Sequence, residues 1–295
     1  MHFRKYHGTG NDFVMLSDHD GRLGPPASLP RDLVSALCDR HTGIGADGVI
    51  RVMSGGPGDD LRMDYYNTDG GAAEMCGNGI RCLVALERRA GTIGDGEFRI
   101  TTPERTVVVR TLGDRTIAAN MGRPKLTKQD VPMEGTGSSL RATVTLDGDD
   151  YEGTGVSMGN PHFVLFDRGL SDDVVLRLGP RLERHPDFPQ RTNVEFVQIE
   201  GVTDVRMRVW ERGIGETLSC GSGACAVAVA AAALERTGPH VRVHVPGGEL
   251  EVEWEAPGDV WLTGPAEEVF AGVVDASWLA RRGLDRFAEL IAKAS

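Results

Sequence analysis

Two cysteines stand where they could exchange protons with a substrate. Cys76 and Cys220 each directly precede a Gly-x-Gly step, and the residues after each step have the composition of a helix. We expect these helices to end at Gly91 and Gly238, because glycine readily takes the left-handed conformation that closes a helix. The sequence therefore predicts one thiol at the N-terminus of each of two helices.

A thiol at a helix N-terminus is a candidate for acid–base chemistry. Thiolate is the reactive form, and a helix N-terminus lowers the pKa of cysteine from about 8.5 into a range of roughly 3.5 to 7.5. The glycines let backbone N–H groups approach an anion, which the helix dipole attracts. Two such thiols on opposite sides of a small carboxylate suit inversion at the adjacent carbon, since one removes a proton while the other donates one. The N–H groups would stabilise the developing charge, so we expect no cofactor.

The cysteine motif belongs to a longer repeat. Gly10-Asn11 precedes the first cysteine and Gly159-Asn160 precedes the second, at similar offsets. The two cysteines lie 144 residues apart in a chain of 295, and this period is too long for a solenoid. We expect two related domains, residues 1–120 and 121–265, with residues 266–295 packing back on the first.

The residues between the motifs have the pattern of short strands. Residues 205–210 alternate polar and apolar side chains, as a half-buried strand does. The helix after Cys220 is built from Ala and Val on every side, which predicts burial all round. The expected fold is α/β (α+β): two pseudo-symmetric domains, each a mainly antiparallel sheet wrapped around a central helix, with the active site in the cleft between them. Further helices are expected at residues 30–41 and 171–178, and a surface helix in the tail at 278–291.

Composition excludes several classes of function. The net charge of −11 repels phosphate backbones and anionic membranes, so neither nucleic acid nor a membrane is an expected partner. The first residues lack the apolar core of a signal peptide, which favours a cytoplasmic location. Five cysteines, an odd number, favour reduced thiols over a disulfide framework. The four lysines lie outside the cysteine motifs, and this argues against a pyridoxal-phosphate enzyme.

Other interpretations of the cysteines stay open. Cys38, Cys82 and Cys225 fall inside predicted helices, where packing is their expected role. The C-x5-C and C-x4-C spacings are longer than most zinc pairs, and the C-x-x-C pattern of redox pairs is absent. A thiol-based redox or metal-binding module is nevertheless one alternative. A two-thiol racemase acting on proline or hydroxyproline is another.

Five motifs, in order along the chain, resemble those of diaminopimelate epimerase. They are HGTGNDF at 7–13, CGNGIRC at 76–82, MGNPH at 158–162, ERGIGET at 211–217 and CGSGAC at 220–225. The resemblance covers nearly the whole chain. It implies a cofactor-independent epimerase that interconverts LL- and meso-diaminopimelate, the step before lysine and a source of the cross-linking residue of the cell wall. It also implies the two-domain fold and a homodimer.

The resemblance also implies roles for individual residues. The acid–base pair falls on Cys76 and Cys220, with His162 and Glu211 supporting the chemistry. The implied substrate contacts are Asn11, Asn67, Gly77, Asn78, Asn160, Asn193, Glu211, Arg212, Gly221 and Ser222. No metal ligand is implied. The chain departs from the pattern at Gly48, where some relatives carry glutamine, and its tail beyond residue 275 extends past many relatives.

Overall fold

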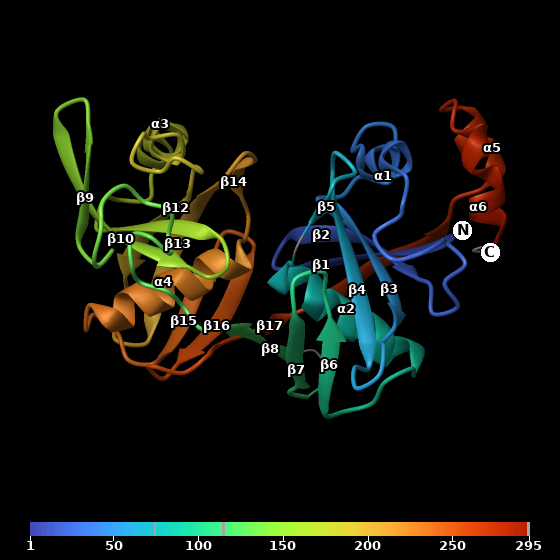
Figure 1. The fold of residues 1–295 in the computed structure, drawn as a ribbon, viewed down its shortest axis with the longest axis horizontal. Coiled ribbons are helices and arrows are strands. Elements are labelled where there is room, and N and C mark those ends of the chain that lie inside the picture. The colour runs from blue at the N-terminus through green and yellow to red at the C-terminus, as the bar shows by residue number, and fades with distance from the viewer. Residues whose placement is uncertain (74, 114–115, 294–295) are drawn as a thin grey trace. The chain divides into compact units, whose positions relative to one another are not determined.

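The chain forms two compact units in the computed structural model, which describes residues 1–73, 75–113 and 116–293 (Figure 1). The first unit comprises residues 1–119 together with 265–295, and the second comprises residues 120–264. Each unit contains one large sheet and its own helices.

The sheet of the first unit has the strand order β18-β1-β2-β3-β4-β6-β7-β8, and β5 pairs with β4. Its strands are β1 (His2–Gly8), β2 (Asn11–Ser17), β3 (Gly48–Ser54), β4 (Leu61–Asn67), β5 (Ala72–Ala73), β6 (Glu97–Thr101), β7 (Thr106–Thr111), β8 (Thr116–Gly122) and β18 (Glu267–Val273). The pairs β2–β3 and β4–β6 are parallel, and the other pairs among the described strands are antiparallel.

The sheet of the second unit has the order β9-β10-β11-β12-β13-β15-β16-β17, and β14 pairs with β13. Its strands are β9 (Ala142–Leu146), β10 (Asp149–Ser157), β11 (Pro161–Phe166), β12 (Asn193–Ile199), β13 (Asp204–Glu211), β14 (Gly215–Thr217), β15 (His240–Val245), β16 (Gly248–Trp254) and β17 (Val260–Pro265). The parallel pairs are β11–β12 and β13–β15.

The two sheets follow the same path. From β1 to β8 and from β10 to β17, parallel pairs occupy the same two places in the strand order. A short strand, β5 or β14, precedes each cysteine motif. The repeat seen in the sequence is therefore a repeat of topology, and the predicted pair of mainly antiparallel, pseudo-symmetric domains is confirmed.

A central helix packs against each sheet. Helix α2 (Gly77–Ala90) contacts β1 to β4 and β18, and α4 (Gly221–Ala233) contacts β10 to β12, β15 and β16 (Figure 1). Nearly every side chain of α4 is buried, as its Ala and Val composition predicts. Both helices begin directly after their cysteine. The glycine at the third helical position of each, Gly79 or Gly223, leaves space for the side chain of Ile50 or Glu195.

The predicted end is right for α2 and wrong for α4. Gly91 adopts φ 74°, and its N–H donates to the last turn of α2. Helix α4 ends at Ala233, five residues before Gly238, because Glu235 takes the left-handed conformation with φ 58° and its N–H donates to the carbonyl of Ala232. A non-glycine residue therefore closes this helix.

Two other helices differ from their predicted lengths. Helix α1 (Arg31–Cys38) ends three residues before His41, because the carboxylate of Asp39 accepts from the backbone N–H groups of His41 and Thr42. Helix α3 (Asp172–Glu183) continues past the predicted end at residue 178. Proline disfavours a helix interior, but Pro180 is tolerated in α3, where Leu178 and Leu182 are buried in a shared apolar cluster.

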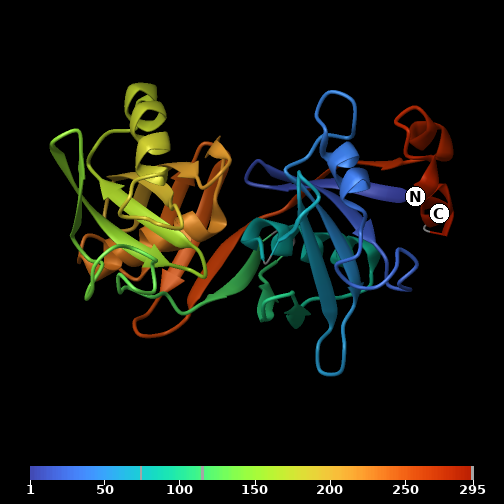
Figure 2. The ribbon, with the colours of Figure 1, turned by 45° about the horizontal axis from the view of Figure 1, so that its top comes forward.

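The C-terminal tail is broken rather than a single surface helix. It forms α5 (Ala276–Ala280), the 3-10 helix η1 (Asp285–Phe287) and α6 (Ala288–Lys293), and Gly283 with φ 66° separates the first two. Leu279 and Leu284 are buried in a core cluster of the first unit. Both views place α5 and α6 beside the N-terminus, where the Met1 amino group donates to the Val274 carbonyl (Figures 1 and 2). The side chain of Ile291 lies outside the described part.

Candidate active site

Cys76 is the residue that caps helix α2 at its N-terminus. Its backbone is extended, with φ −138° and ψ 115°, and the helix begins at the next residue. The side chain is half-buried, and its sulfur lies 3.6 Å from Oδ1 of Asn11, to which it donates. The thiol therefore sits beside the first free N–H groups of the helix.

A network of amides supports Cys76. Asn78 also donates to Oδ1 of Asn11, at 3.2 Å, while the amide nitrogen of Asn11 donates to Asp47 at 2.7 Å. The buried guanidinium of Arg81 donates to Oδ1 of Asn78 at 2.9 Å. These bonds fix the orientation of both predicted substrate-binding amides, and Asp47 and Arg81 are the positioning residues that motif reasoning did not single out.

Charged groups fix the turn that carries Asn11. Asp12 lies 2.6 Å from the ammonium of Lys5 and 2.7 Å from the guanidinium of Arg40. Burial raises the pKa of Asp12, but hydrogen bonds from Arg40 and Lys5 outweigh burial and lower it to about 2. The carboxylate is therefore ionised at neutral pH and ties β1, β2 and the segment after α1 together.

The departure from the family pattern at Gly48 has a steric cause. A Cβ there would lie 2.5 Å from the ring of Tyr65 and 2.6 Å from the carbonyl of Tyr66. Gly48 pairs across the sheet with Asn67, an exposed residue at the end of β4. The Tyr65 ring thus occupies the space into which a side chain at position 48 would have to extend.

Cys220 caps helix α4 in the same extended conformation, with φ −121° and ψ 113°, but it is buried. Its sulfur accepts from the N–H of Gly223 at 3.4 Å and lies 3.5 Å from the hydroxyl of Ser222. Burial, then the negative charges of Glu211 and Glu195, raise its pKa well above that of an ordinary thiol. The expectation of a lowered pKa is therefore wrong for Cys220, because burial and two carboxylates outweigh the helix end and its donors.

His162 is completely buried beside Cys220's helix. Its Nδ1 lies 2.6 Å from Oε1 of Glu195, and its Nε2 lies 3.0 Å from Oδ1 of Asn160. Asn160 in turn donates to Ser222 at 3.3 Å. Two predicted site residues, His162 and Asn160, are thus brought within one hydrogen-bonded group with Ser222 and Cys220.

Hydrogen bonds to buried side chains hold the loop that carries Glu211 and Arg212. Asn193 accepts from the backbone N–H of Arg212 at 2.9 Å and donates to the Pro161 carbonyl. Glu183, from the unpredicted end of α3, accepts from the N–H of Gly213 at 2.9 Å. Both the oxygen and the nitrogen of the Asn193 amide therefore bond to the backbone. The Arg212 side chain is exposed.

Sequence reasoning missed Glu195 and Glu183. Glu195 interrupts an apolar strand, with Val194 before it and Phe196 after it. A carboxylate within an apolar strand is a signal of a paired buried charge, because an unpaired one is strongly disfavoured. Glu183 gave no such signal, since a glutamate near the end of a polar helix is ordinarily exposed.

The structure separates the other cysteines from this chemistry. Cys38, Cys82 and Cys225 are buried. Burial raises the pKa of Cys38 to about 12 and that of Cys82 beyond the usual range of a thiol. Packing is therefore the role that their surroundings support.

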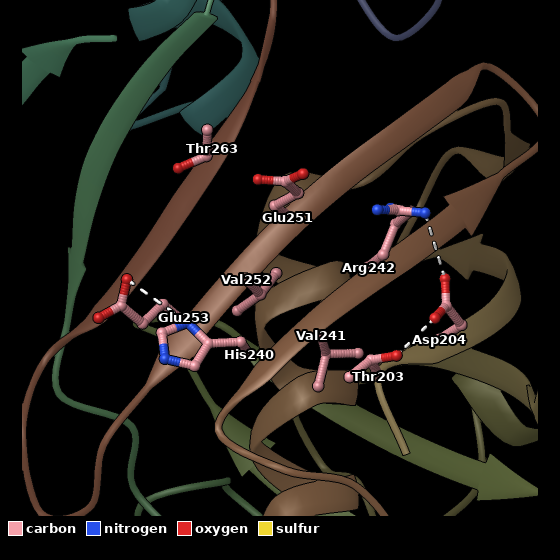
Figure 3. Close-up of a pocket in the computed structure, with 9 residues that line it drawn as sticks. All are labelled: Thr203, Asp204, His240, Val241, Arg242, Glu251, Val252, Glu253 and Thr263. Atoms are coloured by element: carbon pink, nitrogen blue, oxygen red, sulfur yellow. Dashed lines mark hydrogen bonds and ion pairs between the residues drawn. The ribbon is translucent and has the colours of Figure 1, made fainter. Parts of the chain in front are cut away.

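A pocket lies on the second unit's sheet, away from both cysteine motifs, and is lined by residues of β13, β15, β16 and β17 (Figure 3). Arg242 pairs with Asp204 at 3.6 Å across it, and His240 with Glu253 at 3.8 Å. In the part of the chain that the structure describes, His240, Glu253 and Glu255 form the group whose ligand atoms come within 4.8 Å of one another, and all three are exposed. The group includes neither cysteine motif. No described helix has both the length and the apolar character needed to span a bilayer.

The chain matches known proteins over most of its length. The family described as "Diaminopimelate epimerase" matches residues 3–127 and 154–269. The diaminopimelate epimerase of Synechococcus sp. (strain JA-2-3B'a(2-13)) is 43% identical over 280 residues, 92% of this chain and 97% of that protein. The diaminopimelate epimerase of Moorella thermoacetica is 44% identical over 281 residues, 92% of this chain and 98% of that one.

Solved structures with much lower identity share the fold. A hydroxyproline epimerase from Agrobacterium vitis superposes with a TM-score of 0.68 at 15% identity, covering 92% of this chain and 91% of that one. A probable proline racemase from Agrobacterium radiobacter has a TM-score of 0.69 at 14% identity, with coverage of 98% and 95%.

Proposed function

Because the chain belongs to the diaminopimelate epimerase family, we propose that it interconverts LL- and meso-2,6-diaminopimelate with Cys76 and Cys220 as the acid–base pair. The chain is an isomerase. In this role it would supply the precursor of lysine and of the cross-linking residue of peptidoglycan. No cofactor takes part in the proposed reaction.

One observation carries the assignment of the two thiols. Each unit places a cysteine at the N-cap of the central helix that packs against its sheet. The sheets of the two units have the same strand order. In the proposed reaction the thiolate at one cysteine removes the α-proton, and the thiol at the other delivers a proton to the opposite face. The carbon is inverted, the two thiols exchange protonation states, and the reverse reaction restores them.

The environments of the two thiols support a division of labour. The pKa of Cys220 is raised, so we assign it the protonated state before the substrate binds. Cys76 is then the base in the direction that starts from this state. In the structure Cys76 is the donor to the amide oxygen of Asn11, so it must release that proton before it acts as the base. It lies closer to solvent than Cys220, where a substrate can reach it.

The helix ends support binding of the reacting carboxylate. The first N–H groups of a helix lack acceptors within the helix, and here those of α2 and α4 follow the reactive cysteines directly. Charge that develops on the substrate carboxylate during proton removal is stabilised by such donors. We therefore retain Gly77, Asn78, Gly221 and Ser222 as substrate contacts.

The exposed guanidinium of Arg212 supports binding of the distal end. A guanidinium binds a carboxylate through two parallel hydrogen bonds, and diaminopimelate carries a second carboxylate at the far end. Asn67 is exposed, so its amide is available for the same task. For Asn193 we propose an indirect part, holding the Arg212 loop through its 2.9 Å bond.

The homodimer and the cytoplasmic location are also proposals. Val269, Phe270 and Val273 are exposed apolar side chains on β18, which lies at an edge of its sheet. An exposed apolar edge strand is a ready site for pairing with a second chain. Sedimentation analysis of the wild type and of Val269→Lys should give a dimer and a monomer, respectively.

Deuterium incorporation tests the proposed activity. The protein is incubated with LL-diaminopimelate in D2O, and the product is analysed by mass spectrometry and NMR. One deuterium at the inverted α-carbon is expected, because the delivered proton comes from a thiol that exchanges with solvent. Turnover of proline or hydroxyproline with no turnover of diaminopimelate would instead support the other two-thiol racemase.

A further inference from the structure

Glu195 is a buried carboxylate that the proposed two-thiol reaction does not use. It lies on β12, its side chain is fully buried, and its Oε1 is 2.6 Å from Nδ1 of His162. Its Oε2 has no hydrogen-bond partner within the part of the chain that the structure describes. Leaving a buried carboxylate oxygen unsatisfied costs free energy, so the position of this group requires an explanation.

Hydrogen bonds connect Glu195 to Cys220 through three side chains. From the bond to His162 the chain continues over 3.0 Å from Nε2 to Oδ1 of Asn160. The amide nitrogen of Asn160 donates to Oγ of Ser222 at 3.3 Å, and that oxygen lies 3.5 Å from the sulfur of Cys220. All of these residues belong to the second unit.

The chemistry of the groups gives this chain one direction. An amide oxygen can only accept, so Nε2 of His162 carries a hydrogen and donates to Asn160. An amide nitrogen can only donate, so the Ser222 oxygen accepts from it. The hydroxyl hydrogen of Ser222 is then available to donate to the sulfur of Cys220, 3.5 Å away.

A proton shared between Glu195 and His162 sets the direction of these hydrogen bonds. Because Nε2 of His162 carries a hydrogen, the short contact between Nδ1 and Oε1 contains a single further proton. Whichever of the two atoms carries this proton, Nε2 keeps its hydrogen, so the hydrogen bond toward Asn160 has the same direction.

Glu195 also lies close to the thiol through space. A Cβ placed on Gly223 would lie 2.9 Å from Oε1 of Glu195 and 3.3 Å from the sulfur of Cys220. Oε1 of Glu195 and the sulfur of Cys220 are thus within about 6 Å of each other, a range in which a full charge shifts the pKa of a neighbouring group. The titratable groups around this thiol are Glu195 on β12, His162 on β11 and Glu211 on β13.

We propose that Glu195 is a positioning residue: it fixes the tautomer of His162, so that the chain of hydrogen bonds ends with the Ser222 hydroxyl donating to the sulfur of Cys220. A hydrogen bond to the sulfur stabilises the thiolate, which the two-thiol function proposed above requires in one direction of the reaction. Only this catalytic use rests on the proposed function, since the direction of the chain can be measured without substrate.

The experiment compares Glu195→Leu with Glu195→Gln in the full-length protein. Glutamine can donate to Nδ1 through its NH2 group and keeps the direction, whereas leucine leaves Nδ1 without a partner. Iodoacetamide labelling is followed by mass spectrometry that resolves Cys220 from Cys225. At pH 8 we expect Cys220 of Glu195→Leu to react roughly tenfold more slowly than Cys220 of Glu195→Gln, the loss of a bond to a charged sulfur. Both variants lack the Glu195 carboxylate, whose charge raises the pKa of Cys220, so this charge effect cancels in the comparison. Glu195→Gln should label no more slowly than the wild type.

Ser222→Ala removes the last donor while leaving the buried pair intact. It should slow Cys220 labelling roughly tenfold relative to the wild type, and adding it to Glu195→Leu should cause no further loss, because the residues act in series. A folded Glu195→Leu that labels as fast as Glu195→Gln would overturn the proposal. So would independent, multiplying losses in the double variant.

The first unit offers a matched control. Glu87 is a second fully buried glutamate bonded to a histidine, at 2.9 Å from His19, and it lies near the far end of α2. Glu87→Leu should leave Cys220 labelling unchanged. Labelling needs no diaminopimelate, so a wild type inactive in the deuterium experiment would refute the epimerase function and leave this test valid.

Discussion

The two halves of the molecule share a fold and differ in the surroundings of their cysteines. Cys76 is half-buried and donates to the amide of Asn11, while Cys220 is buried among carboxylates and accepts from Gly223. A two-base inversion needs one protonated and one deprotonated thiol at a time. The comparison teaches that a duplicated scaffold supplies equivalent positions, and that different neighbours make the two positions chemically unequal.

Removal of either thiol should have the largest effect. Cys76→Ala and Cys220→Ala should each reduce epimerisation by at least about a thousandfold, because each removes a proton carrier from one face of the substrate. The measurement is the rate of meso-diaminopimelate formation. Cys38→Ala is the control and should retain most activity, since Cys38 is a buried packing residue. Substantial activity in either single variant would contradict the two-base assignment.

Corresponding glycines should respond differently in the two halves. A Cβ at Gly223 would lie 2.9 Å from the Glu195 carboxyl, which His162 holds in place, whereas one at Gly79 would meet the terminal methyl of Ile50 at 2.5 Å. A methyl can move aside by a rotamer change. We expect Gly223→Ala to lower kcat roughly thirtyfold to a hundredfold, a loss within the range of overpacking in a core.

For Gly79→Ala we expect a loss of less than about tenfold, because the atom met is the far end of the Ile50 side chain, which can change its rotamer. Equal losses of kcat in the two glycine variants would show that the packing around these glycines does not differ between the halves.

The charged support of the first half should show in the pH dependence of stability. The pKa of Asp12 is lowered to about 2 from an ordinary 3.8, so its contribution is present above pH 4 and disappears as the pH falls toward 2. Asp12→Asn should therefore lower the free energy of unfolding by about 2 kcal/mol at pH 7. Urea denaturation of both proteins should show this difference shrinking below pH 4; a difference independent of pH would contradict it.

The loop of the second half should give the smallest effect. Glu183 accepts from the N–H of Gly213 and from the Trp210 indole, next to Arg212. Glu183→Gln keeps one acceptor and loses the charge, so we expect KM for diaminopimelate to rise about threefold to fivefold with little change in kcat. Steady-state kinetics separates the two constants. A fall in kcat at constant KM would place Glu183 with the acid–base group instead.

Much of the fold could be predicted from local patterns. The alternation at residues 205–210 and the Ala and Val run after Cys220 each correspond to one element. Helix ends were less predictable. Glu235 closed α4 in place of Gly238, and tertiary burial of Leu182 carried α3 past a proline. In α3, packing outweighed the intrinsic preference of the backbone.

The sequence by itself determined the duplicated topology and the place of each cysteine at a helix start, because glycine spacing and apolar periodicity act over a few neighbouring residues. Only the tertiary structure decided that the pKa of Cys220 is raised and where Glu183 and Glu195 lie. Those depend on burial and on groups that the sheet brings together from distant parts of the chain, such as His162 and Glu195, which are 33 residues apart. Electrostatic effects on a buried group follow from such three-dimensional neighbours, and the local sequence does not specify them.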